Sequence, residues 1–83
     1  MQIFKIRHKQ SGKYWNGQIP QLDRSFESII KLYFNTSGFN WEDIDRLKMY
    51  VNLIWKKKFK EFILSECEIV CFELKEINKI SFL

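Results

Sequence analysis

The stretch FKIRHKQSGKYWNG, residues 4–17, predicts the start of an antiparallel sheet. Apolar and basic residues alternate from Ile3 to Lys9, and a period of two is typical of a strand with one buried face. Ser11-Gly12 provides a residue that tolerates a positive φ in a tight turn. Tyr14 and Trp15 are strand-favouring residues, so we expect them to return as the second strand of a hairpin.

The alternation also assigns the two faces of the first strand. The face that must be buried carries Phe4, Ile6 and His8. The opposite face carries the cations Lys5, Arg7 and Lys9. Because residues two apart in a strand are separated by about 6.6 Å, these cations form a row on an open face.

The segment after the hairpin is less regular. Gln18 to Ser25 contains Pro20 and has no clear period, which indicates a loop. Phe26 to Asn35 fits both a helical and a strand pattern. Its β-branched and aromatic residues favour a strand in the second half, while a helix over Ser25 to Tyr33 is the alternative.

The clearest helical pattern follows. Asn40 is a suitable N-cap, and apolar residues then recur at helical spacing, so we predict a helix from about Trp41 to Lys57. Lys56-Lys57-Lys58 would place positive charge at the negative end of its dipole. Phe59 to Ile63 either extends this helix by two turns or forms a separate one.

The last predicted element is a strand over Glu68 to Lys75, where apolar residues again alternate. Ile77 to Phe82 extends this strand or pairs with it. The order hairpin, strand, helix, strand indicates a single α+β domain over residues 1–83, with a small antiparallel sheet packed against one main helix.

Composition restricts the classes of protein. The 83 residues carry a formal charge of +4, which favours anionic partners without amounting to a basic arm. No apolar run approaches the roughly 20 residues that a membrane span needs, and the N-terminus does not resemble a signal peptide. We therefore expect an intracellular protein that does not enter the membrane. Cys67 and Cys71 lie too far apart along an extended segment for a disulfide, so both should be reduced thiols.

Catalytic and metal-binding motifs are weak. Zinc needs more ligands than Cys67, Cys71 and the distant His8 provide. A Cys-His nucleophile lacks an evident third group that would orient it. We therefore predict no catalytic residues, no metal site, no cofactor and no enzymatic activity.

A ligand-binding face is the stronger candidate. The basic row could meet phosphates, with Arg7 forking onto two oxygens and Tyr14 or Trp15 stacking on a base. Trp41 follows Ser37-Gly38 as Trp15 follows Ser11-Gly12, which would fit two loops that grip one ligand or simply common turn chemistry. The candidate ligand-binding residues are Lys5, Arg7, Lys9, Tyr14, Trp15 and Trp41. The plainer interpretation is a solvated strand face.

Three motifs together resemble small uncharacterised proteins encoded by bacteriophages. They are the FKIRxKxSGxY opening from Phe4 to Tyr14, Gly38 to Trp41 followed by Leu47-Lys48, and the closing EIVxFEL segment from Glu68 to Leu74. The resemblance implies a phage accessory protein that acts in the host cytoplasm. Proteins of that kind often bind and block host machinery, so the expected function is counter-defence, with a host defence protein or an anionic signalling nucleotide as the partner.

The alternative function is nucleic-acid binding by the same face together with the lysine run of residues 56–60. Binding across several phosphates would weaken steeply with salt, whereas an enclosed nucleotide would respond less. Neither pattern determines the oligomeric state, and a homo-oligomer is compatible with both.

Overall fold

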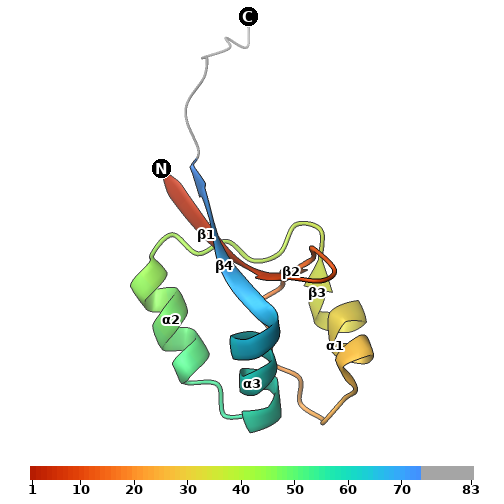
Figure 1. The fold of residues 1–83 in the computed structure, drawn as a ribbon. Helices are drawn as coiled ribbons and strands as arrows, with labels where there is room; N and C mark the ends of the chain where they lie inside the picture. Colours follow the sequence, from red (N-terminus) through yellow and green to blue (C-terminus); the bar gives the residue numbers. More distant parts are fainter. Residues whose placement is uncertain (74–83) are drawn as a thin grey trace, which may run out of the picture.

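The structure of the protein is a computed structural model, and it describes residues 1–73. Figure 1 shows strands at both ends of this part of the chain, with helices between them. In chain order the elements are β1 (Gln2–His8), β2 (Tyr14–Trp15), α1 (Phe26–Tyr33), β3 (Phe34–Asn35), α2 (Ile44–Asn52), α3 (Lys57–Glu66) and β4 (Cys67–Glu73).

The described strands form one antiparallel sheet in the order β3-β2-β1-β4. Its longest pairing joins the two ends of the described chain, because β1 and β4 run side by side from Gln2 opposite Glu73 to His8 opposite Cys67. The predicted α+β class with an antiparallel sheet is confirmed. Within the described residues, α2 and α3 take the place of the one main helix, and α1 precedes them in the chain.

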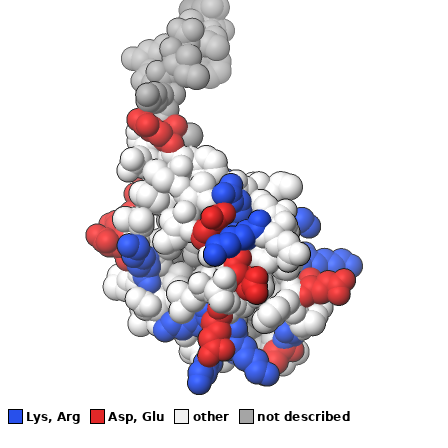
Figure 2. All heavy atoms as spheres, viewed as in Figure 1, with Lys and Arg blue, Asp and Glu red and all other residues white. Residues whose placement is uncertain are grey.

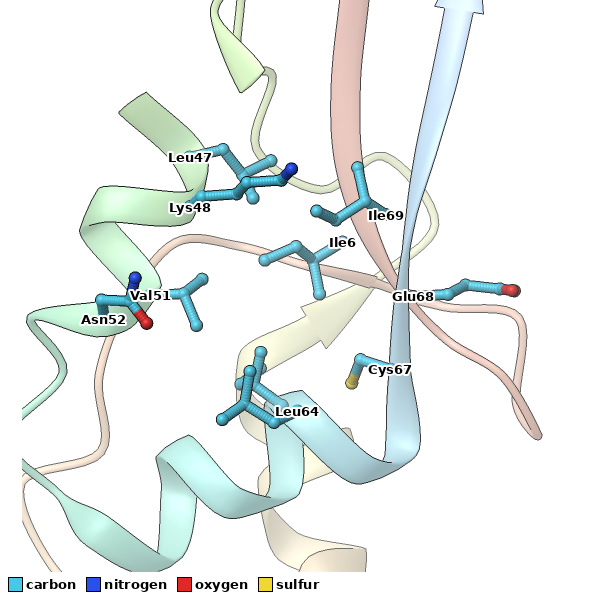
Figure 3. A pocket seen from close by; sticks show the side chains of 10 residues that line it. Ile6, Leu47, Lys48, Val51, Asn52, Leu64, Cys67, Glu68 and Ile69 are labelled. Carbon is cyan, nitrogen blue, oxygen red and sulfur yellow. The ribbon is translucent and has the colours of Figure 1, made fainter. Parts of the chain in front are cut away.

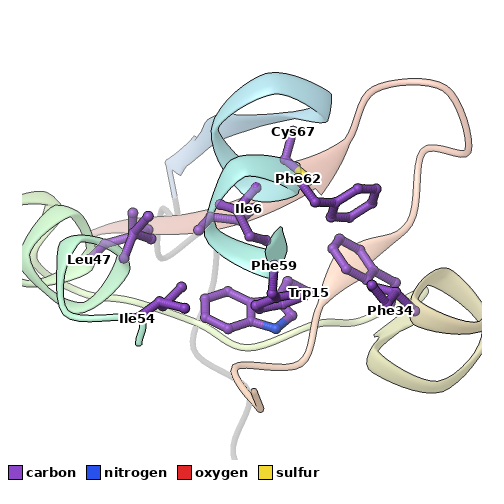
Figure 4. Close-up of a cluster of buried hydrophobic side chains, with 11 residues drawn as sticks. Ile6, Trp15, Phe34, Leu47, Ile54, Phe59, Phe62 and Cys67 are labelled. Carbon is purple, nitrogen blue, oxygen red and sulfur yellow. The ribbon is translucent and has the colours of Figure 1, made fainter. Parts of the chain in front are cut away.

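The core lies between one face of the sheet and these helices (Figure 4). The sheet contributes Ile6, Trp15, Phe34 and Cys67, and the chain between the strands contributes Ile29, Leu47, Val51, Ile54, Phe59, Phe62 and Ile63. His8 is also buried, as its phase with Ile6 predicts. Its ring stacks on Phe62 with centroids 5.5 Å apart, and its Nδ1 lies 2.8 Å from the Ser11 hydroxyl.

The predicted strand in the second half of Phe26 to Asn35 is confirmed only for its last two residues, and the helical alternative is correct up to Tyr33. The segment is helical through Tyr33, and only Phe34–Asn35 pairs as β3. Ser25 caps the helix, because its hydroxyl accepts a hydrogen bond from the Ser28 N–H at 3.2 Å. Helical spacing also turns Ile29 into the core, so packing and capping outweigh the β-branched composition.

The predicted helix from Trp41 to Lys57 begins too early and ends too late. Asp43, rather than Asn40, is the cap, since its Oδ1 accepts from the Asp45 N–H at 2.8 Å. Residues 57–66 form a separate helix. A continuous helix over residues 41–63 would be about 35 Å long. Because a seven-residue strand spans only about 23 Å, the chain must turn back for both halves to reach the core.

The break between α2 and α3 places the lysine run at the start of a helix instead of at the end of one. Lys56 is the N-cap of α3 and makes no capping hydrogen bond with its side chain, and Lys57 and Lys58 begin the helix. The N-terminal end of a helix dipole is positive. The prediction that these lysines compensate a dipole is therefore wrong.

The last strand is confirmed with different bounds, Cys67–Glu73, and the predicted Lys75 and the segment Ile77 to Phe82 lie outside the described residues. Both cysteines are free; Cys67 is buried and Cys71 exposed. Within residues 1–73, no helix combines the length and apolar character needed to cross a membrane.

Candidate functional site: the uncovered face of the sheet

The face of the sheet opposite the helices carries charged and aromatic side chains of β1, β2 and β4. Directly paired residues of an antiparallel sheet point to the same face. Arg7 lies opposite both Tyr14 and Glu68, while Lys5 lies opposite Val70. We call the resulting surface the open sheet face, and it consists of Ile3, Lys5, Arg7, Tyr14, Glu68, Val70 and Phe72.

Arg7 is paired rather than free. Its Nη2 and Nε donate to Oε2 of Glu68 at 2.8 and 3.0 Å, and about a third of each side chain is exposed. The hydrogen bond with Glu68, followed by that with Tyr14, raises the pKa of Arg7 above its ordinary value. The guanidinium therefore stays charged, but a carboxylate already occupies its donors.

Lys5 is also engaged by its neighbours. Its ammonium donates to the carbonyl of Ser37 and lies 5.1 Å from the ring centroid of Tyr14 and 5.5 Å from that of Phe72. The two rings meet edge to face with centroids 5.9 Å apart. A cation over two aromatic rings is a favourable arrangement, so this part of the face is a preformed cation–aromatic cluster.

A glycine turn holds Tyr14 in this cluster. The Asn35 amide oxygen accepts hydrogen bonds from the N–H groups of Ser37 and Gly38, which closes the turn after β3. Gly38 has a φ of 68°, and a Cβ at this position would stand only 2.3 Å from Cβ of Tyr14. Only glycine allows the turn to approach Tyr14 so closely.

The other predicted ligand-binding residues do not join this cluster. Trp15 is 1% exposed and its indole N–H donates to the Gln18 carbonyl at 2.7 Å, so its predicted position beside the basic row is wrong. Trp41 is bonded through its backbone to Phe4 and packs between Phe39 and Tyr50 on the helical side. Lys9 is exposed beyond the end of β1.

A second basic region lies at the start of α3, far along the chain from β1. Trp55 is 64% exposed, and the Lys56 ammonium lies 5.1 Å from its ring centroid. Lys56 also approaches Asp23 at 3.7 Å, while Lys60 donates to the carbonyl of Asn52 at 2.9 Å. Lys57 and Lys58 are both exposed on the first turn.

An apolar groove lies on the helical side of the sheet, between α2, α3 and β4 (Figure 3). Its volume is about 360 Å³, and its walls include Leu47, Val51, Leu64 and Ile69. Glu68 points away from the groove in Figure 3. The groove offers few polar groups that could orient a small charged ligand.

The buried Cys67 lies directly opposite His8, so the structure does bring a cysteine and a histidine together. Burial, as the largest cause, raises the pKa of the Cys67 thiol to about 12, which keeps the sulfur protonated. A nucleophilic cysteine needs the opposite shift. Within residues 1–73, no cluster of three or more His, Cys, Asp or Glu side chains is arranged to hold a metal ion.

Sequence patterns located Lys5, Arg7 and Tyr14 but missed Glu68, Val70 and Phe72. These three alternate within the last predicted strand, which indicates that they share a face. Their position beside β1 depends on the pairing of strands from opposite ends of the chain, and an alternation pattern does not specify that register.

Acidic and basic side chains are interspersed over the surface shown in Figure 2, so charge alone does not mark a site there. Comparison of the chain with protein-family models, with curated proteins and with solved structures gave no match.

Proposed function

We propose that this protein binds another protein through its open sheet face and catalyses no reaction. The observation that carries the proposal is the cluster of Lys5, Tyr14 and Phe72, with the Arg7–Glu68 pair beside it. Aromatic residues and arginine are enriched where proteins meet, and paired charges set orientation at such surfaces.

A protein partner fits this face better than a nucleotide. A phosphate would have to compete with Glu68 for Arg7 and with the Ser37 carbonyl for Lys5. The predicted stacking ring of Trp15 is in the core. A protein surface can instead pack on Tyr14 and Phe72 and leave these pairs intact.

The resemblance to phage accessory proteins supplies the biological setting for this proposal. In that setting the partner is a host defence protein, the site of action is the host cytoplasm, and the effect is counter-defence by occupation of a surface. An anionic signalling nucleotide is the competing ligand that the following experiment distinguishes.

The test compares capture of bacterial host proteins by the parent and by matched variants. Lys5→Glu and Phe72→Ala alter the open sheet face, while Arg46→Glu and Leu32→Ala change exposed helical residues and serve as controls. The yield of a specific partner should fall at least about tenfold with the first pair, as for a central interface residue, and stay unchanged with the second.

Circular dichroism establishes that each variant is folded before its capture is compared. Equal capture by folded Lys5→Glu, Phe72→Ala and the parent would refute docking through this face. Mass spectrometry of the purified parent also tests the competing ligand, because a co-purified nucleotide that is lost in Lys5→Glu would favour nucleotide binding.

A second candidate function is nucleic-acid binding at the start of α3. The observation that favours it is the exposed Trp55 beside a run of lysines that the helix dipole does not stabilise. Lysines can follow phosphates while an exposed indole stacks on a base. Titration of a single-stranded oligonucleotide should then show an affinity that falls steeply with salt.

The matched variants for this candidate are the double change Lys57→Gln, Lys58→Gln and the control Lys31→Gln on α1. The double variant should bind the oligonucleotide more weakly and with a smaller salt slope. Binding that is absent in the parent, or identical in the double variant and the control, would eliminate this candidate.

A further inference from the structure

The outer edge of β4 has the features of a strand that pairs with another strand. β4 is the last strand in the order β3-β2-β1-β4, and no strand within residues 1–73 pairs with its other side. The strand runs for seven residues, CEIVCFE, without the lysine or proline that commonly protects an edge. Ile69 is 40% exposed and Leu64, which lines the same groove, is 62% exposed.

Backbone alternation identifies the groups that face outward. Phe4 exchanges hydrogen bonds with Trp41, and the His8 N–H donates to the Lys13 carbonyl while the His8 carbonyl accepts from the Gly12 N–H, so both residues of β1 point their backbone groups away from β4. The residues that alternate with them, Lys5 and Arg7, therefore bond to β4. Their partners in β4 are Val70 and Glu68, so these two residues direct their backbone groups toward β1. The residues that alternate with them, Ile69 and Cys71, therefore direct their N–H and C=O groups outward.

We infer that β4 pairs with β4 of a second copy of this chain, antiparallel about a two-fold axis at Val70. In this register Ile69 of one copy lies opposite Cys71 of the other, and the outward N–H and C=O groups of both residues are satisfied in both copies. Such a contact is self-complementary, as closed two-fold interfaces require.

Neighbouring registers use the available groups less well. An axis at Ile69 would set Cys71 opposite Cys67, whose N–H already donates to the Ile63 carbonyl at the end of α3. An axis at Cys71 would set Ile69 opposite Glu73, the last residue of β4, so of the outward-facing pairs only the central Cys71 pair would lie between residues inside the strand. The axis at Val70 pairs Ile69 with Cys71 twice, and the occupied N–H of Cys67 affects only the outermost pair, in which Cys67 lies opposite Glu73.

Charge also favours this register. Glu68 of one copy lies opposite Phe72 of the other, so no carboxylates face each other directly. The two Glu68 residues are offset by four positions along the strands, which is about 13 Å. Pairing joins the two sheets edge to edge and keeps both open sheet faces on the same side, so the dimer does not depend on the function proposed above.

The test measures the oligomeric state of the full chain over a range of concentrations by analytical ultracentrifugation. The parent and Cys71→Ala should form dimers, since alanine keeps the backbone N–H. Cys71→Pro removes that N–H from both copies, and we expect its dimer to dissociate on the order of ten- to hundredfold more readily. Proline is tolerated where an edge N–H faces solvent, so the monomer should remain folded by circular dichroism.

The register has its own test with a short bismaleimide. Diagonal neighbours across two strands are about 7–8 Å apart, so the exposed Cys71 residues of the two copies should crosslink through this reagent. A parent that stays monomeric would overturn the inference and assign the edge to another occupant, residues 74–83 or a different protein. A Cys71→Pro variant that dimerises as strongly as Cys71→Ala would also overturn it.

Discussion

Substitution of Gly38 by alanine tests how closely the turn after β3 packs on the open sheet face. The new Cβ would stand 2.3 Å from Cβ of Tyr14 and 3.2 Å from the Trp15 carbonyl oxygen. Carbon atoms in contact are normally about 3.5–4.0 Å apart, so the turn or Tyr14 must move by more than about 1 Å. The φ of 68° adds a backbone cost, because alanine avoids this region.

The expected loss of stability follows from these two terms. Left-handed backbone in a non-glycine residue costs about 1–2 kcal/mol. Overpacking at a well-filled position costs about 1–3 kcal/mol more. Gly38→Ala should therefore lower the free energy of unfolding by about 2–5 kcal/mol, a large share of the roughly 4–12 kcal/mol expected for a domain of this length.

Gly12→Ala is the matched control. Gly12 has a similar φ of 74°, but an added Cβ would meet no heavy atom within 4 Å. It should incur only the backbone cost, and both substitutions restrict the unfolded chain equally. Urea unfolding followed by tryptophan fluorescence measures both losses. Equal losses for the two variants would refute the close contact between the turn and Tyr14.

Other substitutions test the core, the cap and the thiols. Leu47→Ala should lower the free energy of unfolding by about 2–5 kcal/mol, since the side chain is 1% exposed; an unchanged melting temperature would contradict its place in the core. Asp43→Ala should cost about 1 kcal/mol and Asn40→Ala much less, and urea titrations that reverse this order would contradict the cap. At pH 8 a thiol reagent should modify Cys71 in the native protein and both cysteines in urea, whereas rapid native labelling of Cys67 would contradict its burial. Because the folded state holds the pKa of Cys67 at about 12, the stability it contributes is present below its unfolded pKa of about 8.5 and is lost as the pH rises toward 12. Unfolding measured from pH 8 to pH 11 should therefore show a smaller decline for Cys67→Ala than for the parent.

Local patterns predicted the parts of the fold that depend on neighbouring residues. The alternation around Ile6 identified β1 and its buried face, and Ser11-Gly12 identified the turn before Tyr14. The helical spacing of apolar residues after Asn40 predicted a helix with one buried face, and Leu47 and Val51 are the buried residues of α2. Each of these signals depends on residues only a few positions apart, where the period of the side chains decides between helix and strand.

Other features depend on contacts between distant segments. The break after Asn52 is needed because the sheet is too short for one long helix, and the sequence around Leu53 contains neither glycine nor proline to mark it. Phe26 to Tyr33 forms a helix because Ile29 packs in the core and Ser25 caps it. Tertiary packing overrode strand propensity here.

The candidate site also combines features that nearby residues predict with features that depend on contacts between distant segments. Alternation predicted that Lys5 and Arg7 share an open face. It did not predict that Glu68 would neutralise Arg7 or that Phe72 would join Tyr14 beneath Lys5, because those contacts depend on the register of β4. Trp15 was misplaced for a related reason: strand alternation puts it opposite Tyr14, and only the covering helices determine which of the two rings is buried.

The two proposed surfaces share β4 but use different groups of it. The open sheet face uses the side chains of Val70 and Phe72, whereas the proposed dimer uses the backbone of Ile69 and Cys71. Cys71→Pro should therefore weaken dimerisation without removing a side chain from the open sheet face. Phe72→Ala should weaken capture of the partner protein and leave dimerisation unchanged.

Because the two-fold axis sets both open faces on one side, a dimer would present two copies of the Lys5 cluster to one partner. A partner with two matching sites should then bind the parent more tightly than Cys71→Pro, since the second contact becomes intramolecular. Equal affinity of the two for such a partner would show that each copy docks alone.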